Sequence, residues 1–113
     1  MSMRRLGLTA VLAAGVTVAA TAPAAAVTIR GSGSQWSPAR VNIDRGDRVR
    51  WRAVSGTHTV RAYGGNWTFS ERIAAGESVS HRFRRTGTYR FFCSIHGDVS
   101  GGTCTGMCGR VRV

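Results

Sequence analysis

The sequence predicts an all-β domain, a Greek-key β-sandwich or barrel of about seven to eight short strands. Apolar residues alternate with polar ones along several segments, which is the period of a half-buried strand. Turn-forming residues interrupt these segments at short intervals, and no segment offers ten residues of helical periodicity. Many short strands that each bury one face pack most simply as two sheets around one core.

The alternation identifies the strands in chain order. In "DRVRWRAV" every second residue from Val49 is apolar, and the residues between them are arginines. The segments "SVSHRFRR" and "TYRFFC" repeat the pattern, which places His81 and Cys93 on inward faces. The expected strands lie near Val27–Arg30, Ala39–Asp44, Asp47–Ala53, His58–Ala62, Ser78–Arg85, Gly87–Cys93 and Gly109–Val113.

The segments between these strands have simpler interpretations. Arg45–Asp47 reads "RGD", and we expect it to form a hairpin turn between the two strands that flank it. Phe69–Ala74 has room for a single helical turn. We expect His81 to be a structural histidine rather than a metal ligand, and the three tryptophans to be packing residues.

The N-terminal 26 residues read as a secretory signal peptide, residues 1–26. Arg4 and Arg5 precede an apolar run, Leu6–Ala20, that is shorter than the ~20 residues needed to span a bilayer. Cleavage after Ala26 would leave one secreted domain, residues 27–113, with no transmembrane anchor. We expect this domain to be extracellular or held in the cell envelope, and to be a monomer.

The net charge of the chain is strongly positive, at +11, and all of its sixteen basic residues are arginines against five acidic residues. Such a charge favours acidic partners. About half of the arginines occupy the outward positions of expected strands, where solvated side chains are ordinary. They do not form a compact cluster interleaved with aromatic residues, so we expect no specific nucleic-acid ligand.

The residues that could carry chemistry gather near the C-terminus. Cys93 and His96 lie three residues apart where a strand runs into a loop, and Met107 stands just before the last strand. His58 follows a turn that places it at the same end of the sandwich. One thiolate, two imidazoles and a distant thioether form the ligand set of a type 1 (blue) copper site.

At this point the sequence resembles the small cupredoxins, the plastocyanin/azurin family of copper proteins. The resemblance covers nearly all of residues 27–113 and is carried by "WSPARVNIDRGDRVRW", "HTV", "GESVSHRF", "GTYRFFCSIH" and "GMCGRVRV". It implies that His58, Cys93, His96 and Met107 bind one copper ion. It also implies a one-electron carrier with a redox partner protein rather than an enzyme.

Two features depart from the family pattern. Ten residues separate His96 from Met107, and the intervening "GDVSGGTCTG" reads as a long loop where partners of the family often approach. Thr59 follows the first histidine where many members have asparagine. The hydroxyls of Thr59 and Ser94 could support the ligand loops in its place.

Two further cysteines, Cys104 and Cys108, flank Met107. Export to an oxidising compartment favours a disulfide between them, which would hold the loop beside the methionine. The alternative is a closed zinc site that uses both of them together with Cys93 and His96. That zinc site would leave His58 and Met107 without roles.

The sequence therefore leaves several functions open. The leading interpretation is a secreted electron carrier with copper as its cofactor. A copper acquisition or delivery protein would use the same ligands and would exchange the metal with a copper donor or acceptor. A zinc-stabilised basic module that binds polyanions is the third. Hydrolysis by a Cys–His pair lacks an orienting carboxylate or amide, so we expect no enzyme.

Overall fold

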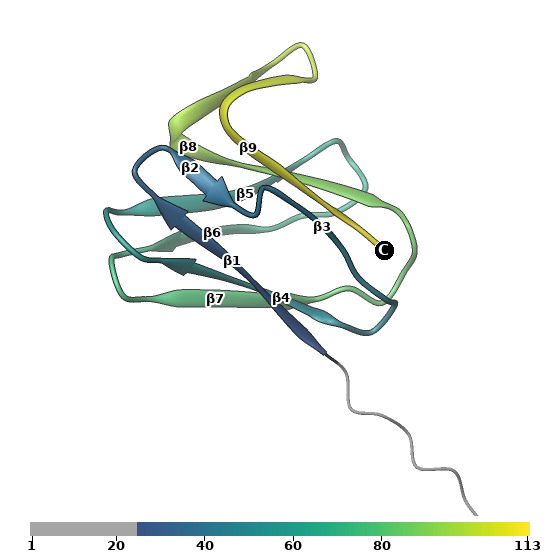
Figure 1. Cartoon of the computed structure of the whole chain (residues 1–113). Coiled ribbons are helices and arrows are strands. Elements are labelled where there is room, and N and C mark those ends of the chain that lie inside the picture. Colours follow the sequence, from purple (N-terminus) through teal and green to yellow (C-terminus); the bar gives the residue numbers. More distant parts are fainter. Residues whose placement is uncertain (1–24) are drawn as a thin grey trace, which may run out of the picture.

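Residues 25–113 are described by the computed structural model, and they form two facing β-sheets with no helix (Figure 1). The predicted signal peptide lies outside these residues except for its last two positions. The strands are β1 (Ala26–Ser32), β2 (Gln35–Ser37), β3 (Arg40–Asn42), β4 (Arg48–Ala53), β5 (His58–Tyr63), β6 (Ser70–Ile73), β7 (Ser78–Arg82), β8 (Thr88–Ser100) and β9 (Thr103–Arg112). The prediction of an all-β sandwich is confirmed, with nine strands. No helix in residues 25–113 is long and apolar enough to cross a membrane.

The two sheets have the strand orders β2-β1-β4-β7 and β3-β9-β8-β5-β6. Most neighbours are antiparallel, but β1 pairs with β4 and β3 pairs with β9 in parallel. Both parallel pairs arise because the chain crosses from one sheet to the other between the paired strands. The crossings bring the strands that carry the expected ligands, β5, β8 and β9, together in the five-stranded sheet.

The core fills the space between the sheets with the inward-facing residues of both. Trp51 and Phe91 are fully buried and meet edge to face with 5.3 Å between ring centroids. Trp36 packs on the other side of Phe91 at 5.6 Å. Trp67 is partly buried and stacks on Phe69. This aromatic centre holds the two sheets in a fixed relation, and the metal-ligand candidates lie at one end of it.

Two sequence-based expectations about local structure are wrong. Ser70–Ile73 is the edge strand β6 rather than a helical turn, because Ile73 is buried opposite His58 in the register with β5. The turn at Arg45–Asp47 is not a hairpin, because it connects β3 in one sheet to β4 in the other. The carboxylate of Asp47 fixes this turn by accepting hydrogen bonds from the backbone N–H groups of Asp44 and Ala25.

The segment expected as a long loop, residues 97–106, is a paired β-hairpin, which we call the hairpin arm. It continues β8 and β9 beyond the body of the sandwich, in yellow-green at the top of Figure 1. Gly101 and Gly102 at its tip have φ values of +57° and +80°, which suit a two-residue hairpin turn. The arm is joined to the main ladder through an irregularity between Phe92 and Gly97.

His81 lies on the inward side of β7, in contact with aromatic rings. Its ring centroid is 4.6 Å from that of Phe83, 5.3 Å from that of Phe69 and 5.5 Å from that of Trp67. Burial lowers the pKa of His81 below its ordinary value of 6.5. The histidine therefore packs as a neutral ring of the core rim.

Truncation of Phe91 should test the packing of the core. Phe91→Ala should lower the free energy of unfolding by about 3–5 kcal/mol, because it leaves a cavity between Trp36 and Trp51. Phe92→Ala removes the same atoms from the outer face, where the ring is half-buried against Tyr63, and should cost about 1 kcal/mol. Urea unfolding of both variants measures the difference, and equal losses would contradict this description of the core.

The lowered pKa of His81 should make stability depend on pH. As the pH falls through the unfolded-state pKa of about 6.5, the unfolded chain takes up a proton that folded His81 resists. The free energy of unfolding should therefore decrease, and this loss should level off below the folded-state pKa. His81→Phe should remove this part of the pH dependence. Urea midpoints measured across a pH series would show it, and parallel curves for both proteins would contradict it.

Candidate metal centre

Three potential metal ligands converge at one end of the sandwich. The ligand atoms of His58, Cys93 and His96 all lie within 4.8 Å of one another. His58 begins β5, whereas Cys93 and His96 both come from β8 and lie within a break in its pairing. That break, between Phe92 and Gly97, lets residues three apart in sequence face the same point.

The thiol of Cys93 lies between the two imidazoles. Its Sγ atom is 3.8 Å from Nδ1 of His58 and 3.6 Å from Nδ1 of His96. Nε2 of His58 lies 2.8 Å from the carbonyl oxygen of Ser55, which can only accept a hydrogen bond. Nε2 of His58 therefore carries the proton, and its Nδ1 presents a lone pair to the cluster.

The three side chains differ in exposure. His58 and Cys93 are completely buried, whereas His96 is exposed. Trp36 packs against the ring of His58 with 5.7 Å between centroids. Gly31 makes this packing possible, since a Cβ there would approach Trp36 to 2.8 Å and His58 to 3.2 Å. The cluster is thus fixed from the inside and reaches the surface through His96.

Thr59 and Ser94 tie the two ligand-bearing strands together. The backbone N–H of Thr59 donates to Sγ of Cys93 at 3.4 Å. The Oγ1 atom of Thr59 accepts from the backbone N–H of Ser94 at 2.7 Å, and the two hydroxyl oxygens are 2.8 Å apart. These contacts hold the sulfur of Cys93 and the backbone of Ser94 in place beside β5.

Met107 is buried in β9 beside the break in β8, with 1% of its surface exposed. A Cβ on Gly97 would lie 2.8 Å from the backbone nitrogen of Met107, and one on Gly106 would collide with the carbonyl oxygen of His96. Gly106 also has a φ of +85°. Two glycines therefore let the backbone of Met107 lie directly alongside His96.

Cys104 and Cys108 are joined by a disulfide within β9 that spans Met107. Among the described residues, Cys93 is the free cysteine. The zinc alternative would need both bonded cysteines as thiolates beside Cys93, and neither belongs to the cluster of ligand atoms. The arrangement therefore separates one free thiol in the candidate cluster from one disulfide.

Sequence reasoning did not identify the residues that orient His58. Ser55 contributes a backbone carbonyl, which has no sequence signature, although the segment "SGTH", Ser55–His58, indicates a turn. Trp36 was expected only as a packing residue. Gly31 lies opposite Trp36 in the register between β1 and β2, a pairing that the sequence does not reveal.

Comparison with solved structures places this β-sandwich with its Cys–His–His cluster in a known class of fold. Amicyanin from Paracoccus versutus (Thiobacillus versutus) matches with a TM-score of 0.64 and 23% identity, over 81% of this chain and 84% of that chain. A purple cupredoxin from Nitrosopumilus maritimus matches with a TM-score of 0.61 and 22% identity, over 77% of this chain and 98% of that chain. A copper-containing nitrite reductase from Thermus scotoductus matches with a TM-score of 0.63 and 23% identity, over 90% of this chain but 24% of that chain.

These likenesses show that the chain has the cupredoxin fold, as its resemblance to that family predicts. No protein-family model and no curated protein matches the sequence. The identities are low, so the likenesses establish the architecture, and the chemistry must be argued from the cluster itself.

Loss of the Thr59 hydroxyl should loosen the cluster. Thr59→Val keeps the side-chain shape but leaves the N–H of Ser94 without its acceptor, which should lower the free energy of unfolding of the metal-free protein by about 1–2 kcal/mol. Thr59→Ser retains the hydroxyl and serves as the control, with a smaller loss. Urea unfolding measures both, and equal stability of the Val variant and the wild type would contradict a supporting role.

Proposed function

We propose that this protein binds one copper ion through His58, Cys93 and His96, with Met107 as a weaker fourth ligand, and carries single electrons. The observation that carries the proposal is the convergence of one thiol sulfur and two imidazole nitrogens within 4.8 Å. Supporting it, the fold is that of the cupredoxins. We further propose that the protein is a secreted monomer and not an enzyme.

The residues present fit copper better than the alternatives. A soft thiolate and two imidazoles suit copper in both oxidation states, whereas calcium and magnesium prefer oxygen ligands. No carboxylate belongs to the cluster within residues 25–113. The other two cysteines are joined to each other, which leaves the donor set short of a closed Cys3His zinc site.

When bound, copper would supply a one-electron couple between Cu(I) and Cu(II). The chain's own residues would hold the ligands nearly unchanged through that cycle. His58 is fixed by Ser55 and Trp36, and Cys93 is fixed by Thr59. Ligands that are preorganised in this way reorganise little when their charge changes. Solved structures of amicyanin include reduced, oxidised and Cu(I) forms.

His96 is the member of the cluster that reaches the surface. It borders a hollow of about 620 Å³ that is also lined by Ile95, Arg72 and the turn around Gly56. Ile95 is an exposed large hydrophobic residue, with 48% of its surface accessible. An exposed apolar residue beside the exposed ligand suits transient contact with a redox partner protein at this end.

Copper loading should test the proposal. Addition of Cu(II) to the purified metal-free protein should produce an intense visible absorption band, because the Cys93 thiolate would bind the metal directly. Cys93→Ser should abolish the band. Cys104→Ser/Cys108→Ser should retain it, since these sulfurs lie outside the ligand cluster. The matched serine variants separate the ligand thiol from the disulfide, and loss of the band in both would contradict the assignment.

Electrochemistry on the loaded protein would then distinguish transport of electrons from transport of metal. The proposal expects reversible one-electron cycling with the metal retained. Ready transfer of copper to a metal-free acceptor, without reversible cycling, would contradict it and indicate copper delivery. A colourless protein that retains one zinc ion would contradict copper binding altogether.

A further inference from the structure

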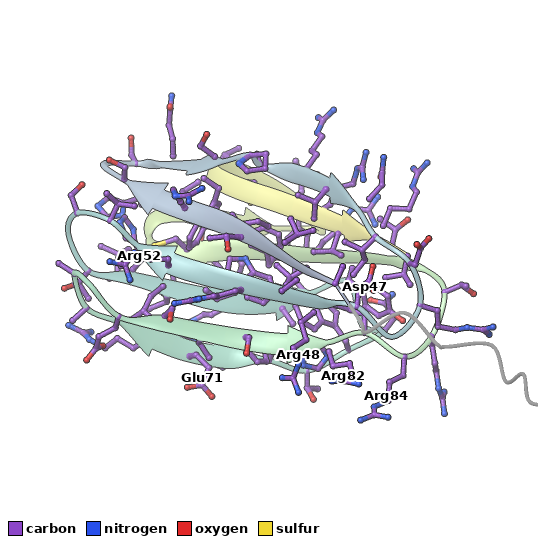
Figure 2. The ribbon with its side chains drawn as sticks, turned by 60° about the horizontal axis from the view of Figure 1, so that its bottom comes forward. Asp47, Arg48, Arg52, Glu71, Arg82 and Arg84 are labelled. Carbon is purple, nitrogen blue, oxygen red and sulfur yellow. A yellow bond between two sulfur atoms is a disulfide. The ribbon has the colours of Figure 1, made fainter. Side chains whose placement is uncertain are left out.

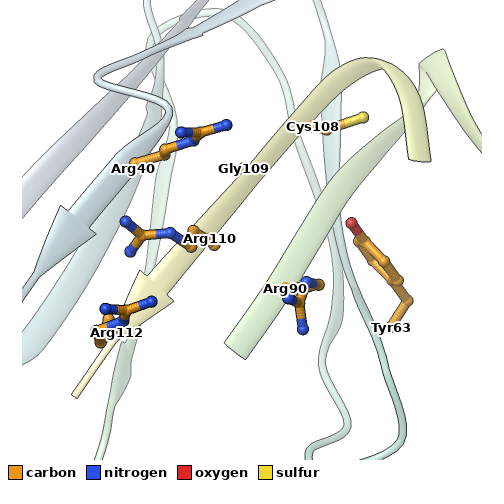
Figure 3. A pocket seen from close by; sticks show the side chains of 7 residues that line it. All are labelled: Arg40, Tyr63, Arg90, Cys108, Gly109, Arg110 and Arg112. Atoms are coloured by element: carbon orange, nitrogen blue, oxygen red, sulfur yellow. The ribbon is translucent and has the colours of Figure 1, made fainter. Parts of the chain in front are cut away.

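The outer face of the five-stranded sheet carries four arginines whose positions are set by strand register. Arg40 of β3 and Arg90 of β8 both lie directly opposite Arg110 of β9. Arg112 follows two residues further along β9 on the same face. We call Arg40, Arg90, Arg110 and Arg112 the arginine patch. Together with Tyr63 they line a shallow hollow of about 420 Å³ (Figure 3).

The patch has no negative charge to balance it. No carboxylate lines the hollow among the residues that the structure describes. Within residues 25–113, one guanidinium group of the patch makes a hydrogen bond, from Arg110 to the Oδ1 atom of Asn42 at 3.3 Å. Like charges directly opposite each other on neighbouring strands are destabilising. The patch is therefore a surface that a counter-charge from outside the chain would stabilise.

The arginines of the other sheet provide a contrast. On the outer face of the four-stranded sheet, Arg50 donates to the hydroxyl of Ser78 at 3.2 Å and Arg52 donates to the carbonyl oxygen of Gly76 at 3.1 Å. Arg48 lies opposite Arg82, and Figure 2 shows both side chains at the bottom of the view. The guanidinium groups of Arg50 and Arg52 are thus engaged within the chain.

The dimensions of the patch indicate what it would bind. Neighbouring strands lie about 4.8 Å apart, so the backbone positions of Arg40, Arg110 and Arg90 span about 10 Å. Arg110 and Arg112 are about 7 Å apart along β9. A single oxoanion is too small to reach all four groups. Several carboxylates spread over a protein surface match this spacing, and guanidinium groups bind carboxylates in a bidentate manner.

We propose that the arginine patch is the docking surface for an acidic partner protein. The inference rests on the proposed function in one respect, namely that an electron carrier needs a transient partner. Nucleic acid fits the patch less well, because Tyr63 is the one aromatic residue that residues 25–113 contribute to the hollow, and a single ring offers no stacking platform for successive bases. Charge complementarity of this kind increases the association rate and selects the partner.

The arginine patch lies close to the candidate metal centre, but its side chains point away from the ligands. Arg90 lies three residues before Cys93 on β8, and Cys108, which lines the hollow, follows Met107 on β9. The arginines face outward, whereas Cys93 and Met107 face the core. Substitutions in the patch should therefore leave the copper spectrum unchanged, which allows the two proposals to be tested on the same samples.

The experiment measures binding of fluorescently labelled poly-L-glutamate to the full chain at low ionic strength. Arg90→Glu/Arg110→Glu reverses two charges in the patch, and Arg48→Glu/Arg50→Glu reverses two charges on the other sheet with the same net charge. The patch variant should bind at least about tenfold more weakly, and the control variant within about threefold of the wild type. The salt dependence of binding should flatten only in the patch variant.

Arg40→Gln/Arg112→Gln provides a second test if the first variant unfolds, with circular dichroism to check folding. Equal weakening in the patch and control variants would contradict the inference, because net charge alone would then explain binding. Tighter binding to an oligothymidylate of equal charge than to poly-L-glutamate would contradict the proposal and would indicate nucleic acid as the ligand. Competition by inorganic phosphate beyond that of chloride would indicate a single-oxoanion site and would also overturn the proposal.

The visible copper band separates this inference from the proposed function. A wild-type protein without the band that still binds poly-L-glutamate through the patch would contradict the copper proposal alone. A protein with the band that loses equal affinity in both variants would contradict the docking proposal alone.

Discussion

The site depends on one constraint, which is that β8 must leave its hydrogen-bonded ladder directly after Phe92, just before Cys93. A regular strand would turn residues three apart to opposite faces. The interruption between Phe92 and Gly97 instead brings Cys93 and His96 to the same point, with 3.6 Å between Sγ and Nδ1. A bulge of this kind is a common device for redirecting a side chain at a functional site.

Breaking the ladder exposes backbone groups that need other partners, and β5 supplies them. Thr59 accepts the N–H of Ser94 and donates its own N–H to the sulfur of Cys93. These contacts replace the missing ladder bonds at the position where the ligands converge. The glycines of the hairpin arm serve the same end, because only residues without a Cβ allow β9 to pass so close to the carbonyl of His96. The support of the metal centre is therefore largely backbone hydrogen bonding.

Much of the fold and of the ligand cluster could be predicted from the sequence, because the sequence patterns that indicate them are local. The alternation around Trp51, and the spacing of Cys93 and His96 at the end of an apolar strand, indicated the fold and the expected ligands. The remainder depends on pairing between distant segments. Ser70–Ile73 contains a single apolar residue because it is an edge strand with little to bury, so it lacks alternation. The hairpin arm has a glycine-rich, polar sequence typical of a loop, and it is paired because it extends an existing ladder.

Successive residues of β9 face alternately the core and the outer surface of the sheet. Met107 and Val111 are buried in the core, and between and after them Cys108, Arg110 and Arg112 face outward. The same alternation that buries Met107 and Val111 therefore places Arg110 and Arg112 on the outer face. Register with β3 and β8 then decides that these arginines gather into one patch rather than scatter. A sheet with one buried face needs polar residues on its other, solvated face. Folding does not require those polar residues to be all positive or to lie opposite one another. The unbalanced charge on this face is thus better explained by binding to an external partner than by folding.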